Sequence, residues 1–152
     1  NVLRSGNKML AALTLLTDAA KGSVAIFIAL DLVGFPAAYW AGLAALLGHI
    51  FPVWLSFKGG KGVAVFIGTG IVLSPLPGLS MLSVWLLVAL IFRRSSLAAL
   101  IATLSVPLYM AVLGEIYGAL VVGVQVGVIY WAHRDNISRL WKGQEPRIGQ
   151  ST

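Results

Sequence analysis

The loop Lys58–Gly62 carries the residue types that bind phosphate. It reads Lys-Gly-Gly-Lys-Gly and lies between two long apolar runs. Glycines let a backbone turn with positive φ, and consecutive N–H groups in such a turn form an anion-binding concavity. Two lysines add charge, and a helix that begins after the loop adds the positive end of its dipole. The spacing is not that of a P-loop; the alternative is a loop that contacts anionic lipid head groups.

Two other polar segments follow apolar runs. In His133–Leu140, His133 and Asn136 are three residues apart and share a helix face. Imidazole and carboxamide groups both bind hydroxyl or phosphate oxygens. The segment Arg93–Ser96 offers two cations and two hydroxyls, and Arg4 adds a cation near the start of the sequence. The alternative for each is a solvated helix end whose charge only sets membrane topology.

Apolar runs must position these loops. The 152 residues are 59% hydrophobic and only 11% charged, too few charges to cover a soluble domain and typical of several membrane-spanning helices. The runs cover 9–31, 36–56, 62–75, 78–92, 96–113 and 115–132. Glycines and prolines predict a tight turn between the third and fourth runs. We therefore expect an all-α polytopic membrane bundle of six spans that forms one domain over residues 1–152.

The charges fall on one side of this arrangement. Between six spans, the loops on one side contain Arg4, Lys8, Lys58, Lys61, Arg93, Arg94, Arg134, Arg139, Lys142 and Arg147. The positive-inside rule places these loops and the C-terminus in the cytoplasm. The polar clusters then share one membrane face, an arrangement suited to small phosphorylated substrates that arrive from the cytosol.

Two charges lie inside a predicted span. Asp18 and Lys21 are three residues apart, so we expect a mutual ion pair that faces the bundle, either structural or in contact with substrate. His49 is expected to have a structural role within the bundle. Small residues such as Gly118 and Gly123 are expected at helix contacts. The sequence has no cysteine and no cluster with metal-ligand spacing, so no metal site is expected.

These motifs resemble those of a known family. The segment Gly48–Ala64 resembles the central motif of the bacterial acyl-phosphate:glycerol-3-phosphate acyltransferases, the PlsY family, which reads Gly-His-x-Phe-Pro-Val-x-x-x-Phe-Lys-Gly-Gly-Lys-Gly-Val-Ala. The segment His133–Leu140, continued by Gly143 and Glu145, resembles its C-terminal motif, and Asn1–Arg4 resembles the end of its first motif. That family has seven spans and a serine in its first motif. This sequence lacks the first span and that serine.

The resemblance implies a reaction and a set of roles. Glycerol 3-phosphate attacks the acyl carbon of an acyl phosphate, which gives lysophosphatidic acid and phosphate without a cofactor. The implied catalytic residues are Lys61, His133 and Asn136; the implied substrate-binding residues are Arg4, Lys58, Gly59, Gly60, Gly62 and Ser96. Glu145 is expected to be structural. The proton acceptor stays open between His133 and a phosphate oxygen of the donor.

The expected location and partners follow. A chain of this kind is expected in the bacterial cytoplasmic (inner) membrane as a multi-pass protein with its active site facing the cytoplasm. Its partners would be the two substrates and membrane lipid, with no nucleic acid. The alternative function is a transporter or channel for small phosphorylated anions, which the one-sided basic ring and the lack of a polar path across the spans disfavour.

Overall fold

The apolar runs form helices. A computed structural model describes residues 8–149. Its elements are α1 (Lys8–Leu32), α2 (Phe35–Ile50), the 3-10 turn η2 (Val53–Leu55), α3 (Val63–Leu73), α4 (Pro75–Phe92), α5 (Ser95–Val112), α6 (Ile116–Ala132) and α7 (Arg134–Trp141). The expectation of an all-α fold is confirmed.

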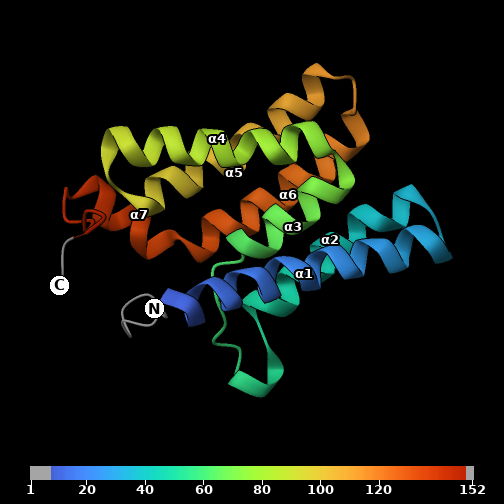
Figure 1. Ribbon diagram of the computed structural model, residues 1–152, viewed down its shortest axis with the longest axis horizontal. Coiled ribbons are helices and arrows are strands. Elements are labelled where there is room, and N and C mark those ends of the chain that lie inside the picture. The colour runs from blue at the N-terminus through green and yellow to red at the C-terminus, as the bar shows by residue number, and fades with distance from the viewer. Residues whose placement is uncertain (1–7, 150–152) are drawn as a thin grey trace.

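The helices form one bundle in which α3 and α6 lie between two outer layers (Figure 1). Helix α1 packs against α2 and α3, and α4 packs against α5. Helix α6 contacts both α5 and α2 and so joins the two halves. The connection from α2 to α3, which contains η2, projects from the bundle (Figure 1). This connection includes the predicted phosphate loop.

Helix length separates the apolar elements into two classes. Within residues 8–149, four helices are long and apolar enough to cross a membrane, namely α1, α2 with η2, α4 and α5, and the number is five if the bent pair α6–α7 counts as one span. Helix α3 has 11 residues, about 16 Å at 1.5 Å per residue, against a hydrocarbon core of ~30 Å. The third predicted run is therefore helical but too short to cross a bilayer alone.

The turn between α3 and α4 is tighter than the sequence indicated. Only Ser74 separates the two helices, and Pro75 is the first residue of α4. Proline is well suited to this position because the first turn of a helix needs no backbone N–H donor. The predicted run 78–92 therefore begins three residues earlier, at Pro75.

Helices α1 and α3 cross at close range. A Cβ on Gly68 would lie 2.1 Å from the carbonyl oxygen of Ala19, and one on Gly22 would lie 2.8 Å from that of Val65. The Ser23 hydroxyl donates a 3.0 Å hydrogen bond to the Gly68 carbonyl across this crossing. Small residues and an interhelical hydrogen bond are the usual means of helix association in lipid. This crossing fixes α1 relative to the first half of α3, between Val65 and Gly68.

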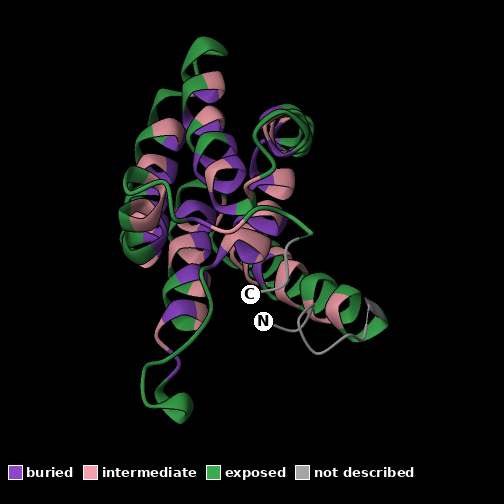
Figure 2. Cartoon of the chain, turned by 90° about the vertical axis from the view of Figure 1, so that its left-hand side faces the viewer, coloured by how far each residue is buried: buried purple, intermediate pink, exposed green. Residues whose placement is uncertain are grey.

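Burial is concentrated between the helices, whereas their outer faces are exposed (Figure 2). The exposed faces are apolar: Leu90 and Leu120 are 70% and 68% exposed. Polar side chains such as Thr69, Thr103 and Gln125 are buried inside instead. Apolar surface on the outside and polar groups inside are expected where the surrounding solvent is lipid.

Candidate active site

The C-terminal segment folds back onto the turn between α4 and α5. Helix α7 is bent 65° from α6. The chain then returns so that the backbone N–H of Ile148 donates to the Arg93 carbonyl at 2.6 Å. The Arg93 guanidinium lies 3.5 Å from the Ile148 carbonyl. This return brings Glu145 beneath the start of α5.

Glu145 is the centre of a polar cluster. Its Oε1 accepts hydrogen bonds from the Ser96 hydroxyl and the Asn136 amide, both at 2.6 Å. Its Oε2 accepts one from Arg139 at 2.7 Å. Burial would raise the pKa of the Glu145 carboxyl, but the three hydrogen bonds and the charge of Arg139 outweigh it, so the pKa is lowered. The carboxylate is therefore ionised at neutral pH.

Lys61 connects the glycine loop to this cluster. Its ammonium donates to Asn136 Oδ1 at 2.5 Å. A cavity of about 400 Å³ opens here, lined by Lys61, Ser95, Ser96, Asn136, Arg139, Glu145, Pro146, Arg147 and Ile148. Three cationic side chains, amide and hydroxyl groups in one cavity suit a small anion that also carries hydroxyls.

His133 lies at the bend between α6 and α7 and is only 2% exposed. Its Nδ1 is 2.8 Å from the Ile129 carbonyl, so Nδ1 carries the proton and Nε2 holds the free electron pair. Burial lowers the pKa of His133, and nearby Lys61 lowers it further, against opposing effects of the Ile129 hydrogen bond and Glu145. The ring is thus neutral at pH 7. It does not belong to the described lining of the 400 Å³ cavity.

The glycine loop uses two of its amides to fix its own shape. The N–H of Gly59 donates to the Ile50 carbonyl at 3.1 Å, and that of Gly60 donates to the His49 carbonyl at 3.3 Å. The prediction that consecutive N–H groups of the loop bind an anion is therefore wrong for Gly59 and Gly60, because carbonyl groups at the end of α2 already accept both hydrogen bonds. Gly62, with φ of +79°, precedes α3 and leaves no room for a Cβ, which would lie 2.3 Å from Leu46 Cδ1.

A second cavity lies on the other side of the loop. Its volume is about 490 Å³, and its lining consists of Asp18, Lys21, Ala45, Gly48, His49, Pro52, Trp54, Leu55, Lys58, Gly59 and Gly60. Six of the predicted site residues are thus divided between two cavities, whereas Gly62 and His133 line neither. Lys61, Ser96 and Asn136 line the first, whereas Lys58, Gly59 and Gly60 line the second. Arg4 lies outside the described residues.

Three charged residues that line the first cavity are not among the predicted site residues, namely Arg139, Glu145 and Arg147. The sequence predicts topogenic charge for Arg139 and Arg147 and a structural role for Glu145. Arg139 follows Asn136 by three residues and so shares its helix face, a signal that was available. No local pattern places Glu145 beside Ser96, because the contact spans 49 residues.

Comparisons with known proteins agree with this picture. The family model described as "Glycerol-3-phosphate acyltransferase" matches residues 1–143. A glycerol-3-phosphate acyltransferase of Agrobacterium fabrum is 52% identical over 150 residues, which are 99% of this chain and 73% of the relative. One of Jannaschia sp. is 50% identical over 152 residues, which are 100% of this chain and 75% of the relative.

Solved structures show the same similarity. The crystal structure of PlsY, an integral membrane glycerol 3-phosphate acyltransferase, in its glycerol 3-phosphate form matches with a TM-score of 0.92 and 37% identity, over 97% of this chain and 76% of that chain. The lysophosphatidic acid form matches with a TM-score of 0.92 and 37% identity, over 98% and 78%. The chain therefore belongs to the glycerol-3-phosphate acyltransferase family of multi-pass integral membrane proteins.

Proposed function

We propose that this membrane acyltransferase moves a fatty acyl group from an acyl phosphate to the 1-hydroxyl of glycerol 3-phosphate. The new bond joins the hydroxyl oxygen to the acyl carbon, and the bond from that carbon to the phosphate oxygen breaks. The products are lysophosphatidic acid and inorganic phosphate. An acyl phosphate is an activated mixed anhydride, so the reaction needs positioned cations and hydrogen-bond donors rather than a protein nucleophile.

The observation that carries this proposal is the junction of Lys61 with Asn136 beside the Glu145 cluster. We assign the 400 Å³ cavity to glycerol 3-phosphate. Lys61, Ser96 and Asn136 would hold its phosphate and hydroxyls, with Arg139 and Arg147 as further cations. The proposal is supported by the glycerol 3-phosphate form of the similar PlsY structure.

We assign the other side of the loop to the donor. Lys58 supplies charge to the acyl-phosphate head group, and Gly59 and Gly60 let the loop lie close to it. Gly62 precedes the first turn of α3, whose first N–H groups have no partner within the helix, and it stays in the proposed binding set although it does not line this cavity. The apolar Trp54 and Leu55 in this cavity suit the start of an acyl chain. Arg4 stays in the proposed binding set.

His133 is the proposed protein base. Its neutral ring leaves Nε2 able to accept a proton, and the proposed transfer requires the glycerol hydroxyl to reach the ring from the 400 Å³ cavity, which His133 does not line. The competing proton acceptor is a phosphate oxygen of the donor. If His133 is the acceptor, a substitution of His133 alone should stop turnover, whereas it should not do so if the donor phosphate accepts the proton.

The proposed topology follows the basic residues. Six helices of this chain cross or enter the cytoplasmic membrane, and the C-terminus and both cavities face the cytoplasm. Helix α3 is the short one, and its central residues Phe66 and Thr69 are buried against protein rather than lipid. A short buried helix is compatible with membrane depth because protein surrounds its ends. The similarities above do not favour the transporter alternative.

A donor comparison tests this function. The protein in lipid nanodiscs is given glycerol 3-phosphate with either palmitoyl phosphate or palmitoyl-coenzyme A, and lysophosphatidic acid is measured by mass spectrometry. We expect product with palmitoyl phosphate and at most traces with the thioester. Equal or greater product with the thioester would contradict the proposed donor and leave the acyltransferase activity intact.

A further inference from the structure

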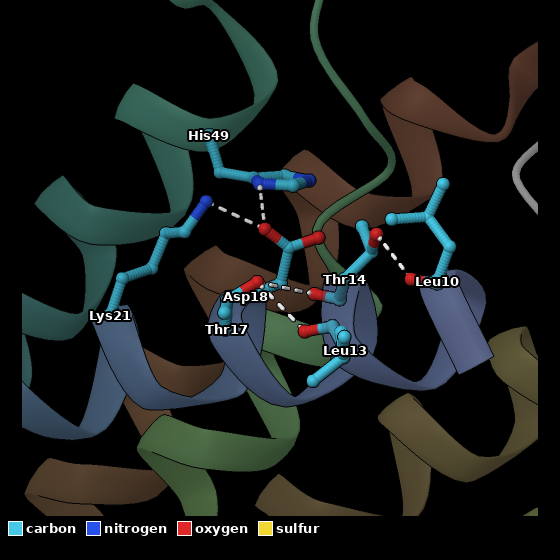
Figure 3. A network of polar contacts seen from close by, with 7 residues as sticks. All are labelled: Leu10, Leu13, Thr14, Thr17, Asp18, Lys21 and His49. Atoms are coloured by element: carbon cyan, nitrogen blue, oxygen red, sulfur yellow. Dashed lines mark hydrogen bonds and ion pairs between the residues drawn. The ribbon is translucent and has the colours of Figure 1, made fainter.

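Asp18 of α1 is the acceptor of a charged network that lines the 490 Å³ cavity and to which the proposed reaction assigns no role (Figure 3). Its Oδ1 accepts from the Lys21 ammonium at 2.6 Å, and the same oxygen lies 3.5 Å from Nδ1 of His49 on α2. The side chains of Asp18 and His49 are only 17% and 14% exposed. The predicted ion pair of Asp18 and Lys21 is thus confirmed, although the Lys21 side chain is 51% exposed rather than turned into the bundle. His49 is a third member that the sequence did not indicate.

Neighbouring hydroxyls do not share this carboxylate. Thr14 and Thr17 donate to carbonyls of their own helix, at Leu10 and Leu13 (Figure 3). A carboxylate beside Nδ1 favours the tautomer with the proton on that nitrogen and restrains the ring. Asp18 is therefore placed where its carboxylate can orient the His49 imidazole.

The other edge of the His49 ring meets the glycine loop. A Cβ on Gly60 would lie 2.2 Å from His49 Nε2, so only glycine leaves space for the ring. The His49 carbonyl also accepts the Gly60 N–H at 3.3 Å. Gly60 is held from two directions by one residue, and the next residue in the chain is Lys61, whose ammonium binds Asn136.

We propose that Asp18 is a positioning residue: by orienting His49 it fixes the turn at Gly60, and so fixes the point from which Lys61 enters the 400 Å³ cavity. This inference rests on the proposed function, in which Lys61 contacts substrate. Stability of the fold does not by itself explain this network. A largely buried charged group in a membrane helix costs free energy, and an apolar contact at the same place would stabilise the fold equally well. A misplacement of about 1 Å at a reacting group costs up to about 100-fold in rate.

The test uses Asp18→Asn, His49→Gln and the double variant, assayed in nanodiscs with saturating donor. Each single change should lower kcat by about tenfold or more and change KM for glycerol 3-phosphate by less than about threefold, since Ser96, Asn136 and Arg139 stay in place. The double variant should be within about threefold of the worse single variant, because both act through one contact. Asp31→Asn, the same change at the exposed far end of α1, should leave kcat unchanged.

Wild-type kcat in Asp18→Asn, or a double variant whose loss is the product of the two single losses, would overturn the proposal. Asp18→Glu keeps a carboxylate at this position, so it should retain part of the kcat that Asp18→Asn loses. If the loss came from a purely structural defect, Asp18→Glu would be as inactive as Asp18→Asn.

A second pair of variants keeps the test valid if Asp18→Asn folds poorly. Gly60→Ala should lower kcat because its methyl group meets the His49 ring. In the His49→Ala background the ring is absent, so Gly60→Ala should cost clearly less than it costs in wild type, and any loss that remains is that of the donor contact assigned to Gly60. A full additional loss there would show that the ring does not transmit the effect. If the wild-type protein transferred no acyl group from an acyl phosphate, the proposed donor would be refuted instead. The same variants would then be assayed with the donor that the wild-type protein uses.

Discussion

The ammonium of Lys61 and the amide oxygen of Asn136 lie 2.5 Å apart, although 75 residues separate them in the chain. Asn136 uses its other end to donate to Glu145. The amide thus connects the cation of the glycine loop with the carboxylate that gathers Ser96 and Arg139. A carboxamide is suited to this place because it accepts from Lys61 and donates to Glu145 at the same time.

Asn136→Asp should therefore be more harmful than its size suggests. The new carboxylate still accepts from Lys61 but no longer donates to Glu145, and two carboxylates then face each other. We expect kcat/KM for glycerol 3-phosphate to fall by about 100-fold or more. Asp135→Asn, the reverse exchange at the exposed neighbouring position, is the matched control and should remain near wild type. Near-normal kcat/KM in Asn136→Asp would contradict the described role of the amide.

Glu145→Gln should destabilise the fold. It removes the charge that receives hydrogen bonds from Ser96, Asn136 and Arg139. Hydrogen bonds to charged groups contribute more than neutral ones, so the expected loss is about 1–3 kcal/mol in the free energy of unfolding. SDS-titrated unfolding of the purified protein measures it. An unchanged unfolding midpoint would show that the return of the C-terminal segment does not depend on this carboxylate.

The same pair of proteins should differ in pH dependence. The pKa of Glu145 is lower in the fold than its usual value of 4.5, so the unfolded state binds more protons as the pH falls through this range. The contribution of Glu145 is fully present above pH 4.5 and is lost as the pH falls through the lowered pKa. The difference in stability between wild type and Glu145→Gln should shrink below pH 4.5. A stability difference between the two proteins that grows on acidification would contradict the lowered pKa of Glu145.

His133→Gln tests the identity of the base. If His133 accepts the proton, kcat should fall by about 100-fold or more, and the acidic limb of the kcat–pH profile should disappear. In wild type this limb should lie below the usual histidine value of 6.5, because burial lowers the pKa of His133. Near-normal turnover of His133→Gln with saturating substrates would leave the donor phosphate as the acceptor.

The crossing of α1 and α3 predicts a contrast between two glycines. Gly68→Ala puts a methyl group 2.1 Å from the Ala19 carbonyl, so the helices must separate. The expected cost is about 1–3 kcal/mol, the usual range for overpacking. Gly123→Ala has no atom within 4 Å of its new methyl group and should leave stability unchanged or slightly raised. Equal unfolding midpoints of the two variants would contradict the described crossing.

The sequence predicted elements better than it predicted contacts. All six apolar runs are helices, because long apolar runs have no other stable form in a bilayer. Gly118 lies at a helix contact as expected, where a Cβ would meet the Tyr39 hydroxyl at 2.6 Å, but Gly123 meets nothing within 4 Å. A small side chain shows that a residue could lie at a helix contact. Whether it does so depends on the rotation of the helix about its axis, which is set by the packing of the whole bundle.

The family resemblance names residues of the candidate site but not their arrangement. The residues Lys61, Ser96 and Asn136 were named from the sequence and do line one cavity. Their division from Lys58, Gly59 and Gly60 was not foreseen, because it depends on the loop closing against the end of α2 through backbone hydrogen bonds. The place of Glu145 depends on the 65° bend at His133, which no periodicity indicates.

The most direct test of the central claim is phosphate release from palmitoyl phosphate by wild type and two lysine variants in nanodiscs. Lys61→Ala removes the cation that joins the glycine loop to Asn136, and Lys142→Ala removes an exposed lysine of the same end of the molecule. We predict that one phosphate is released for each lysophosphatidic acid formed, and only when glycerol 3-phosphate is present. The rate of phosphate release should fall by about 100-fold or more in Lys61→Ala and should not fall in Lys142→Ala. Phosphate release that does not need glycerol 3-phosphate, or full activity of well-folded Lys61→Ala, would contradict the account.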